Sequence, residues 1–238
     1  MTKIRSRASV IPNLFTAMNM FCGFLSILNA SQGKFIYAAW LIIVAAIFDA
    51  LDGMVARLTS STSSLGVQLD SLSDVVSFGV APAFLVYTTY LNQMDIWGII
   101  ISSLLMIAGG FRLARFNVQL IGFDKNFFVG LPIPTSAMTV STFILSFYEP
   151  GTGFGSPEVS FIIPMVIILS FLMVSRIKYD TFPNLSFQEI RKRPFTIILA
   201  LAGMILLIIT KGNAVFYIFV LFVLFGIFRH IFYMISKK

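Results

Sequence analysis

Four aspartates lie close together in a chain that is otherwise poor in charged residues. Asp49 and Asp52 end an apolar run (AAIFDALDGMVAR), and Asp70 and Asp74 lie within LGVQLDSLSDVVSFG. The spacings are i, i+3 and i, i+4, so on helices each pair occupies one face. Carboxylates without accompanying His or Cys are hard oxygen ligands that select Mg²⁺, Mn²⁺ or Ca²⁺. Four of them suit two ions that clamp a phosphoryl group during displacement.

Small residues share these two helix faces. Gly53 and Ala56 continue the face of the first aspartate pair, and Gly66 precedes the second pair on its face. A short connection at about 58–65 makes the two helices antiparallel neighbours, which leaves room for a ligand between them. Small residues in membrane helices also allow close helix packing, and that alternative stays open. Arg57 follows at the helix end, where its guanidinium could grip a phosphate.

The elements that carry these residues must be membrane helices. Hydrophobic residues make up 58% of the 238 residues and charged residues 11%, with a mean hydropathy of +0.92, whereas soluble domains are about a quarter charged. A bilayer accepts this composition, because a spanning helix needs about 20 apolar residues. The expected fold is an all-α integral membrane protein with about eight transmembrane helices. The predicted spans are 13–30, 36–57, 66–90, 96–114, 132–148, 158–175, 195–211 and 213–235.

The spans are expected to form one membrane domain over residues 1–238. A six-helix catalytic core should cover about 10–180, with the aspartate segment at 49–74. The remaining helix pair, about 194–236, carries no motif and would serve packing or a homodimer contact. The single cysteine, Cys22, lies in an apolar run and is expected only to pack, since one cysteine makes no disulfide framework.

Basic residues are distributed unevenly between the two predicted membrane sides. With eight spans, 15 of the 17 lysines and arginines fall on the side of both termini, and only Lys34 and Lys211 fall on the other. The positive-inside rule therefore predicts a multi-pass protein of the cell membrane, with both termini and the aspartates on the cytoplasmic side. These cations would face anionic headgroups and phosphate-bearing substrates. Nucleic acid is not an expected partner, because no basic stripe is interleaved with exposed aromatic residues.

The spacing of the aspartate segment carries a family resemblance. The pattern Asp49-x2-Asp52-Gly53-x2-Ala56-Arg57-x8-Gly66-x3-Asp70-x3-Asp74 resembles, at every defined position, the signature of the CDP-alcohol phosphotransferases. The resemblance implies that the first three aspartates hold two divalent ions, and that Asp74 contacts one ion and serves as the general base. It also implies that Gly53, Arg57 and a loop hydroxyl, Ser63, receive the CDP moiety. Further candidates for the CDP-lipid site are Ala56, Gly66, Asn13 and Thr16.

Three further stretches resemble the phosphatidylserine synthase branch of that family. They are IPNLFTAMNMFCGF (11–24), GGFRLARFNV (109–118) and FVGLPIPTSA (128–137). The branch implies transfer of a phosphatidyl group from CDP-diacylglycerol to L-serine, within membrane lipid and with Mg²⁺ or Mn²⁺, giving phosphatidylserine and CMP. The same chemistry with inositol phosphate, glycerol phosphate or an archaeal-lipid donor stays open.

Polar residues in two of these stretches are candidate substrate contacts. Arg112 and Arg115 stand at i and i+3, with Asn117 just beyond. Arginine's planar fork suits serine's carboxylate or the lipid phosphate, and the alternative is anchoring by the positive-inside rule. In the first span, Thr16 and Asn19 recur at helical spacing and either line the nucleotide pocket or bond to a neighbouring helix.

A different class of function is also compatible with intramembrane carboxylates. A cation- or proton-coupled transporter would use them as a relay. Transporters commonly show repeated halves with acids along a pathway, whereas here the four aspartates fall within 49–74 and no internal repeat is visible. A non-catalytic lipid-binding scaffold would not need four clustered carboxylates. The sequence therefore favours the enzyme.

Overall fold

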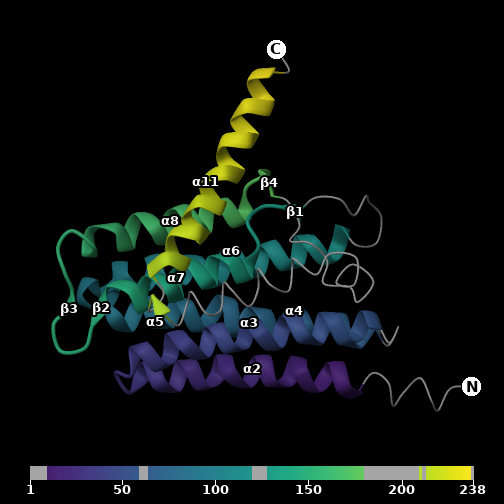
Figure 1. Cartoon of the computed structure of the whole chain (residues 1–238), viewed down its shortest axis with the longest axis horizontal. Coiled ribbons are helices and arrows are strands. Elements are labelled where there is room, and N and C mark those ends of the chain that lie inside the picture. Colours follow the sequence, from purple (N-terminus) through teal and green to yellow (C-terminus); the bar gives the residue numbers. More distant parts are fainter. Residues whose placement is uncertain (1–9, 59–63, 120–127, 180–208, 211–212, 237–238) are drawn as a thin grey trace, which may run out of the picture.

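The protein is a bundle of membrane helices. The computed structural model describes residues 10–58, 64–119, 128–179, 209–210 and 213–236 (Figure 1). The helices are α2 (Val10–Ser31), α3 (Phe35–Leu58), α4 (Ser64–Asp74), the π-helix η1 (Val75–Val80), α5 (Ala81–Thr89), the 3₁₀-helix η2 (Leu91–Met94), α6 (Asp95–Gln119), α7 (Ile133–Phe147), α8 (Val159–Val174) and α11 (Asn213–Ser236). Two short antiparallel pairs join β1 (Phe128–Val129) to β4 (Lys178–Tyr179) and β2 (Tyr148–Glu149) to β3 (Gly153–Phe154).

The predicted class, an all-α integral membrane protein, is confirmed. Among the described residues, five helical stretches are long and apolar enough to cross a membrane. The helices α7 and α8 are apolar and shorter, and they match the spans expected at 132–148 and 158–175. The span expected at 195–211 lies outside the described residues apart from 209–210.

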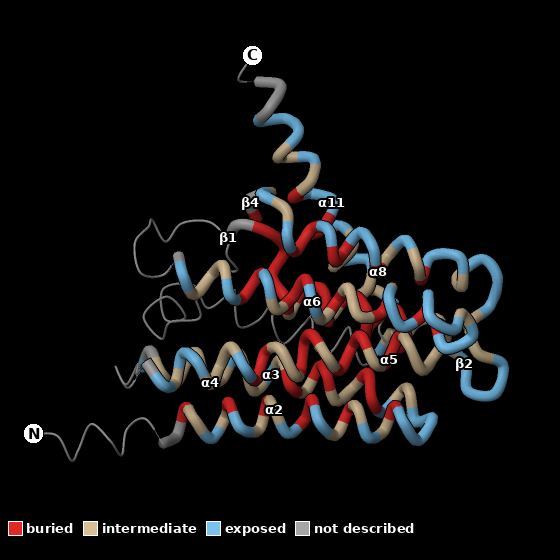
Figure 2. Tube along the Cα trace, turned by 180° about the vertical axis from the view of Figure 1, so that it is seen from behind, coloured by how far each residue is buried: buried red, intermediate tan, exposed pale blue. Residues whose placement is uncertain are grey.

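Burial follows the pattern expected of a bundle in lipid. Buried residues lie on the helix faces that meet inside the bundle, and exposed residues lie on the outer faces (Figure 2). The outward-facing side chains include large apolar ones such as Phe24, Phe171 and Phe228. Hydrocarbon can cover such a surface, whereas the polar backbone must be satisfied within each helix.

The first two helices form an antiparallel hairpin. Gly33, with φ of +73°, takes the left-handed conformation that ends α2, a conformation that glycine adopts without steric cost. The amide of Lys34 then donates to the carbonyl of Asn29 at 2.9 Å, and α3 begins at Phe35. This hairpin places the first residues of α2 beside the last turns of α3, where Asp49 and Asp52 lie.

The third predicted span, 66–90, is not one uniform helix. α4 ends at Asp74, the π-helix η1 follows, and α5 completes the span. The amide of Ala81 donates to the carbonyl of Val76, five residues back, as in a π-turn. Pro82 follows at the start of α5, and a proline cannot donate the ordinary helical hydrogen bond to the carbonyl four residues before it. The proline thus accounts for a widened turn directly after Asp74.

The helix ends that carry the predicted site residues lie at one end of the bundle. The N-terminal ends of α2 and α4 and the C-terminal ends of α3 and α6 lie together there, and the β2–β3 turn lies at the opposite end (Figure 1). α6 continues to Gln119, beyond the expected end at 114, and the sequence has no glycine or proline between 114 and Gly122. Arg112, Arg115 and Asn117 are therefore all helical.

The C-terminal helix α11 packs on α7 and on β4. Phe216 makes an edge contact with Phe143 of α7, with ring centroids 5.5 Å apart. At the contact with β4, Gly226 lies against the ring of Tyr179, and a Cβ on Gly226 would clash with that ring. The beginning and middle of α11 are thus fixed to the core, while its last turns extend away from the bundle (Figure 1).

A close contact between α2 and η1 gives a test of this packing. A Cβ built on Gly23 would lie 2.7 Å from the Cα of Ser77, and a backbone atom cannot rotate away. Gly23→Ala should therefore destabilise the protein by about 1–3 kcal/mol through overpacking, measured as a lower midpoint of thermal unfolding in detergent. Gly110→Ala is the matched control, since a Cβ there has no neighbour within 4 Å. Equal midpoints for the two variants would contradict the contact.

Candidate functional site

Three of the four predicted aspartates meet between α3 and α4. One carboxylate oxygen each from Asp49, Asp70 and Asp74 lies within 4.8 Å of the other two. Asp74 is buried, and the other two are half-buried. The helical spacing and the antiparallel arrangement of α3 and α4 bring these side chains to one place, as the sequence predicts. We call these three residues the carboxylate cluster.

Asp52 lies beside the cluster and is held by the first helix. Its Oδ2 accepts a hydrogen bond of 2.8 Å from Thr16 Oγ1 of α2. Both side chains are buried, with 6% of Asp52 and 4% of Thr16 exposed. The structure therefore brings Asp52 and Thr16 together, and the Thr16 hydroxyl contacts a carboxylate instead of an open surface.

The cluster has the chemistry of a divalent-cation site. Its like charges repel, since Asp49, Asp52 and Asp70 all act electrostatically on Asp74. Asp70 Oδ1 is buried and has no hydrogen-bond partner among the described residues. A buried carboxylate oxygen without a partner is costly, and a cation would satisfy it. The donors are all carboxylate oxygens, which fit Mg²⁺, Mn²⁺ or Ca²⁺.

Arg112 contributes positive charge to the environment of Asp74. It lies on α6, is 6% exposed, and its charge interacts with that of Asp74. Its guanidinium also stacks over the Phe116 ring, with 5.4 Å from Cζ to the ring centroid. A buried guanidinium whose charge interacts with that of Asp74 could bind an anionic group that reaches the cluster.

Arg115 has a different environment, although it lies only three residues further along α6. Its guanidinium donates to the backbone carbonyls at the end of α8, at 3.4 Å to Met173, 2.9 Å to Val174 and 3.2 Å to Ser175. These carbonyls lack helical partners, and a cation there also complements the helix dipole. A Cβ on Gly130 would lie 2.8 Å from the same guanidinium. Arg115 therefore fastens α6 to α8 and to the segment before α7.

Asn117 also connects two helices. Its Nδ2 donates to Ser71 Oγ of α4 at 2.8 Å, and Ser71 lies between the two aspartates of α4 in sequence. Asn117 thus fixes the end of α6 against the helix that carries Asp70 and Asp74.

The remaining candidates for the CDP-lipid site are partly described by the structure. Gly53 and Ala56 of α3, Gly66 of α4 and Asn13 of α2 are all half-buried. Arg57 belongs to α3, but its side chain lies outside the described residues, as does Ser63. The predicted binding of the CDP-lipid by these residues stays a prediction.

Two serines that the sequence analysis did not select tie α4 and η1 to α2. Ser73 Oγ donates to the Thr16 carbonyl at 3.0 Å, and Ser77 Oγ donates to the Asn19 carbonyl at 2.8 Å. Both serines are fully buried. The signal was present in the sequence, because two hydroxyls at i and i+4 in an apolar span are expected to face a neighbouring helix.

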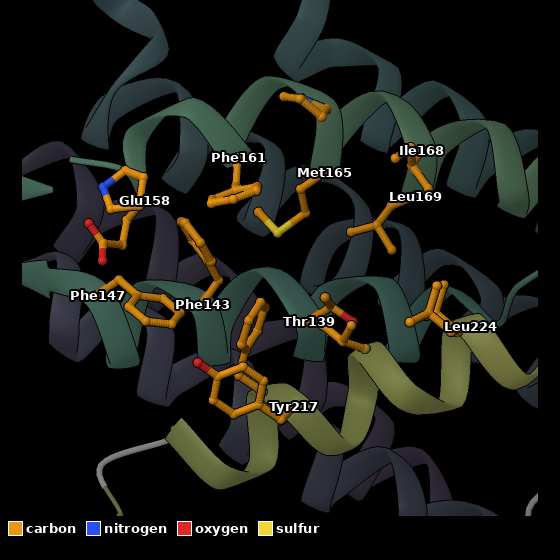
Figure 3. Close-up of a pocket in the computed structure, with 15 residues that line it drawn as sticks. Thr139, Phe143, Phe147, Glu158, Phe161, Met165, Ile168, Leu169, Tyr217 and Leu224 are labelled. Carbon is orange, nitrogen blue, oxygen red and sulfur yellow. The ribbon is translucent and has the colours of Figure 1, made fainter. Parts of the chain in front are cut away.

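A large apolar cavity lies away from the cluster. It has a volume of about 550 Å³ between α7, α8 and α11, and its lining includes Phe143, Phe161, Met165 and Leu224 (Figure 3). Glu158 is the one carboxylate among its described lining residues. This lining suits hydrocarbon, and its residues include no group of carboxylates that could hold a cation.

Comparison with known proteins gives a consistent family. The profile of the CDP-alcohol phosphatidyltransferase family matches residues 9–177. A protein of Helicobacter pylori (strain J99), named CDP-diacylglycerol–serine O-phosphatidyltransferase, is 38% identical over 227 residues, which cover 95% of this chain and 93% of the relative. The protein of that name from Bacillus subtilis is 35% identical over 72% of this chain and 90% of its own length.

An archaeal relative is also similar. The archaetidylserine synthase of Methanothermobacter thermautotrophicus is 44% identical over 171 residues, covering 71% of this chain and 69% of the relative.

The carboxylate cluster predicts cation binding that can be measured without any substrate. Added to a Mn²⁺ solution, the purified protein should lower the electron paramagnetic resonance signal of the free ion. Asp70→Asn should weaken the affinity of the protein for Mn²⁺ at least about tenfold, because affinity depends on the number of charged ligands. Asp95→Asn is the control, since Asp95 begins α6 at the opposite end of the bundle. Binding by Asp70→Asn as tight as that of the wild type would contradict the site.

Proposed function

The chain belongs to the CDP-alcohol phosphatidyltransferase family, and we propose that it transfers a phosphatidyl group from CDP-diacylglycerol to the hydroxyl of L-serine. The products would be phosphatidylserine and CMP. The observation that carries the proposal is the carboxylate cluster, with oxygens within 4.8 Å of one another at one end of a membrane bundle. The name of the Helicobacter pylori relative, a CDP-diacylglycerol–serine O-phosphatidyltransferase that is similar over 95% of this chain, supports serine as the acceptor.

Asp49, Asp52, Asp70 and Asp74 are the proposed ligands of a divalent pair, Mg²⁺ or Mn²⁺. When bound, such ions would neutralise the pyrophosphate of the donor and the charge that develops on the leaving phosphate oxygen. The buried Oδ1 of Asp70 supports this assignment, because no described residue donates a hydrogen bond to it and a cation would compensate its negative charge.

Asp74 is the proposed general base. The serine hydroxyl oxygen forms a bond to the phosphorus of the lipid phosphate, the bond from that phosphorus to the CMP oxygen breaks, and Asp74 accepts the hydroxyl proton. An aspartate is a weak base for an alcohol, so much of the rate must come from alignment of the two substrates. The burial of Asp74, which is 8% exposed, supports this role because it restricts the carboxylate to few orientations.

Arg112 is the proposed partner of serine's carboxylate. Its charge lies close enough to act on Asp74, so an acceptor bound to Arg112 would keep its hydroxyl near the base. Arginine binds a carboxylate through two parallel hydrogen bonds. Arg115 is the weaker candidate, since its guanidinium already donates to three carbonyls of α8.

The donor is expected to lie beside the cluster with its acyl chains in the bilayer. Gly53, Ala56 and Gly66 would leave space for the CDP moiety, and Arg57 and Ser63 would contact it. The uneven distribution of basic residues supports a cytoplasmic site in the cell membrane, where serine is available.

A second donor is favoured by one comparison. The relative named archaetidylserine synthase is 44% identical over 171 residues, and the Helicobacter pylori relative is 38% identical over 227 residues. An archaeal-lipid donor with serine as acceptor is therefore the alternative, and it would use the same residues for the chemistry.

Activity is tested by CMP release in detergent. With CDP-diacylglycerol and Mn²⁺, serine should give turnover at least about tenfold faster than glycerol phosphate or inositol phosphate, because only serine matches a site for one carboxylate. EDTA should abolish turnover, and Mg²⁺ or Mn²⁺ should restore it. Faster turnover with another acceptor would refute the serine assignment, and full activity in EDTA would refute the metal site.

The two arginines of α6 provide a matched pair for the acceptor site. Arg112→Lys should raise the serine KM about tenfold or more, since lysine cannot reproduce a bidentate contact worth about 1.5–3 kcal/mol, while the KM for the donor moves much less. Arg115→Lys should instead lower the midpoint of thermal unfolding, because it loses carbonyl contacts to α8. A serine KM that responds only to Arg115→Lys would reverse the assignment.

A further inference from the structure

The first helix presents one buried row of small and polar residues to the helices of the site. Thr16, Asn19, Gly23 and Ser26 stand at i, i+3, i+7 and i+10 and lie on one face of α2. All four are buried. Gly23 permits the close approach of Ser77, and Ser77 Oγ donates to the Asn19 carbonyl at 2.8 Å. This face is therefore in direct contact with α4 and η1.

Two side chains of this row reach carboxylates on two different helices. Thr16 Oγ1 donates to Asp52 Oδ2 of α3 at 2.8 Å, and Asn19 Nδ2 donates to Asp74 Oδ1 of α4 at 3.5 Å. The backbone carbonyls of the same two residues accept hydrogen bonds from Ser73 and Ser77. Thr16 and Asn19 thus connect α2 to both helices that carry the aspartates.

Both side chains are buried where α2 contacts the helices of the site. Thr16 is 4% exposed and Asn19 is 0% exposed, and both donate to carboxylates that the proposed function assigns to the chemistry. In addition, Asn19 Oδ1 is buried without a hydrogen-bond partner among the described residues. An unpaired buried acceptor lowers stability, so stability alone does not account for an amide at this position.

We propose that Thr16 and Asn19 are positioning residues that hold the carboxylates of Asp52 and Asp74 in the orientation the site requires. The inference rests on the proposed function for the roles of those two aspartates. Groups that hydrogen-bond to a ligating carboxylate orient it, and their loss typically costs about 10–100-fold in metal affinity or activity. The role requires no contact between either residue and a substrate.

The proposal separates catalysis from stability. Asn19→Leu removes the amide at similar size, and it should lower kcat at least about tenfold while both KM values stay within about threefold. Its unfolding midpoint should change little, because removal of the unpaired Oδ1 acceptor offsets the loss of the 3.5 Å hydrogen bond to Asp74. Thr16→Val should weaken Mn²⁺ affinity about 10–100-fold, and Thr16→Ser, which keeps the hydroxyl, should restore it.

Ser26→Ala is the matched control on the same helix. Ser26 Oγ donates to the Ala38 carbonyl at 2.8 Å, so its loss should lower the unfolding midpoint without changing kcat or Mn²⁺ affinity. A wild-type kcat for Asn19→Leu, or a loss accompanied by a lower midpoint as in Ser26→Ala, would overturn the role of Asn19. Wild-type Mn²⁺ affinity in Thr16→Val would overturn that of Thr16.

The proposed function can fail independently of this inference. If the wild-type protein released no CMP with serine, the acceptor assignment would be wrong. Mn²⁺ affinities are measured without serine, so they would still decide the positioning roles: Asn19→Leu should also bind Mn²⁺ more weakly, because Asp74 belongs to the carboxylate cluster.

Discussion

Repulsion among carboxylates inside an apolar bundle is the constraint on which the rest of this structure depends. Charged groups in a membrane are costly, and here oxygens from three aspartates lie within 4.8 Å of one another. The surrounding helices compensate in specific ways: Arg112 contributes positive charge, and Thr16 and Asn19 donate hydrogen bonds from α2. The close packing of α2 against the site helices is thus a condition for keeping the carboxylates together.

The polar residues near the site divide into two groups with different tasks. The charge of Arg112 interacts with that of Asp74, whereas Arg115 and Asn117 join α6 to α8 and α4. The second group keeps the helix that carries Arg112 in register with the helix that carries Asp74. A polar residue in a membrane enzyme can therefore matter for chemistry while touching only backbone carbonyls or a serine.

The spacing of residues within one helix was sufficient to predict much of the site. The face shared by Asp70 and Asp74 follows from helical periodicity, and the span predicted at 36–57 agrees closely with α3 at Phe35–Leu58. The contact of Thr16 with Asp52 was not predictable, because it depends on how closely two helices approach. Nor was the target of Arg115, which lies 58 to 60 residues away in sequence. Helical periodicity predicts which face of a helix a residue occupies, whereas the residue that it contacts depends on how the helices pack.

The π-helix Val75–Val80 sets the rotational phase between the aspartates of α4 and the buried face of α5. Each residue of an α-helix advances the chain by about 100° around the axis. Adding or removing one residue here would turn Asp70 and Asp74 by roughly that angle while α5 stayed in place. The segment contains none of the aspartates, yet its length determines the direction in which they point relative to α5. Evolutionary insertions and deletions are therefore expected in the connections between helices and not in this turn.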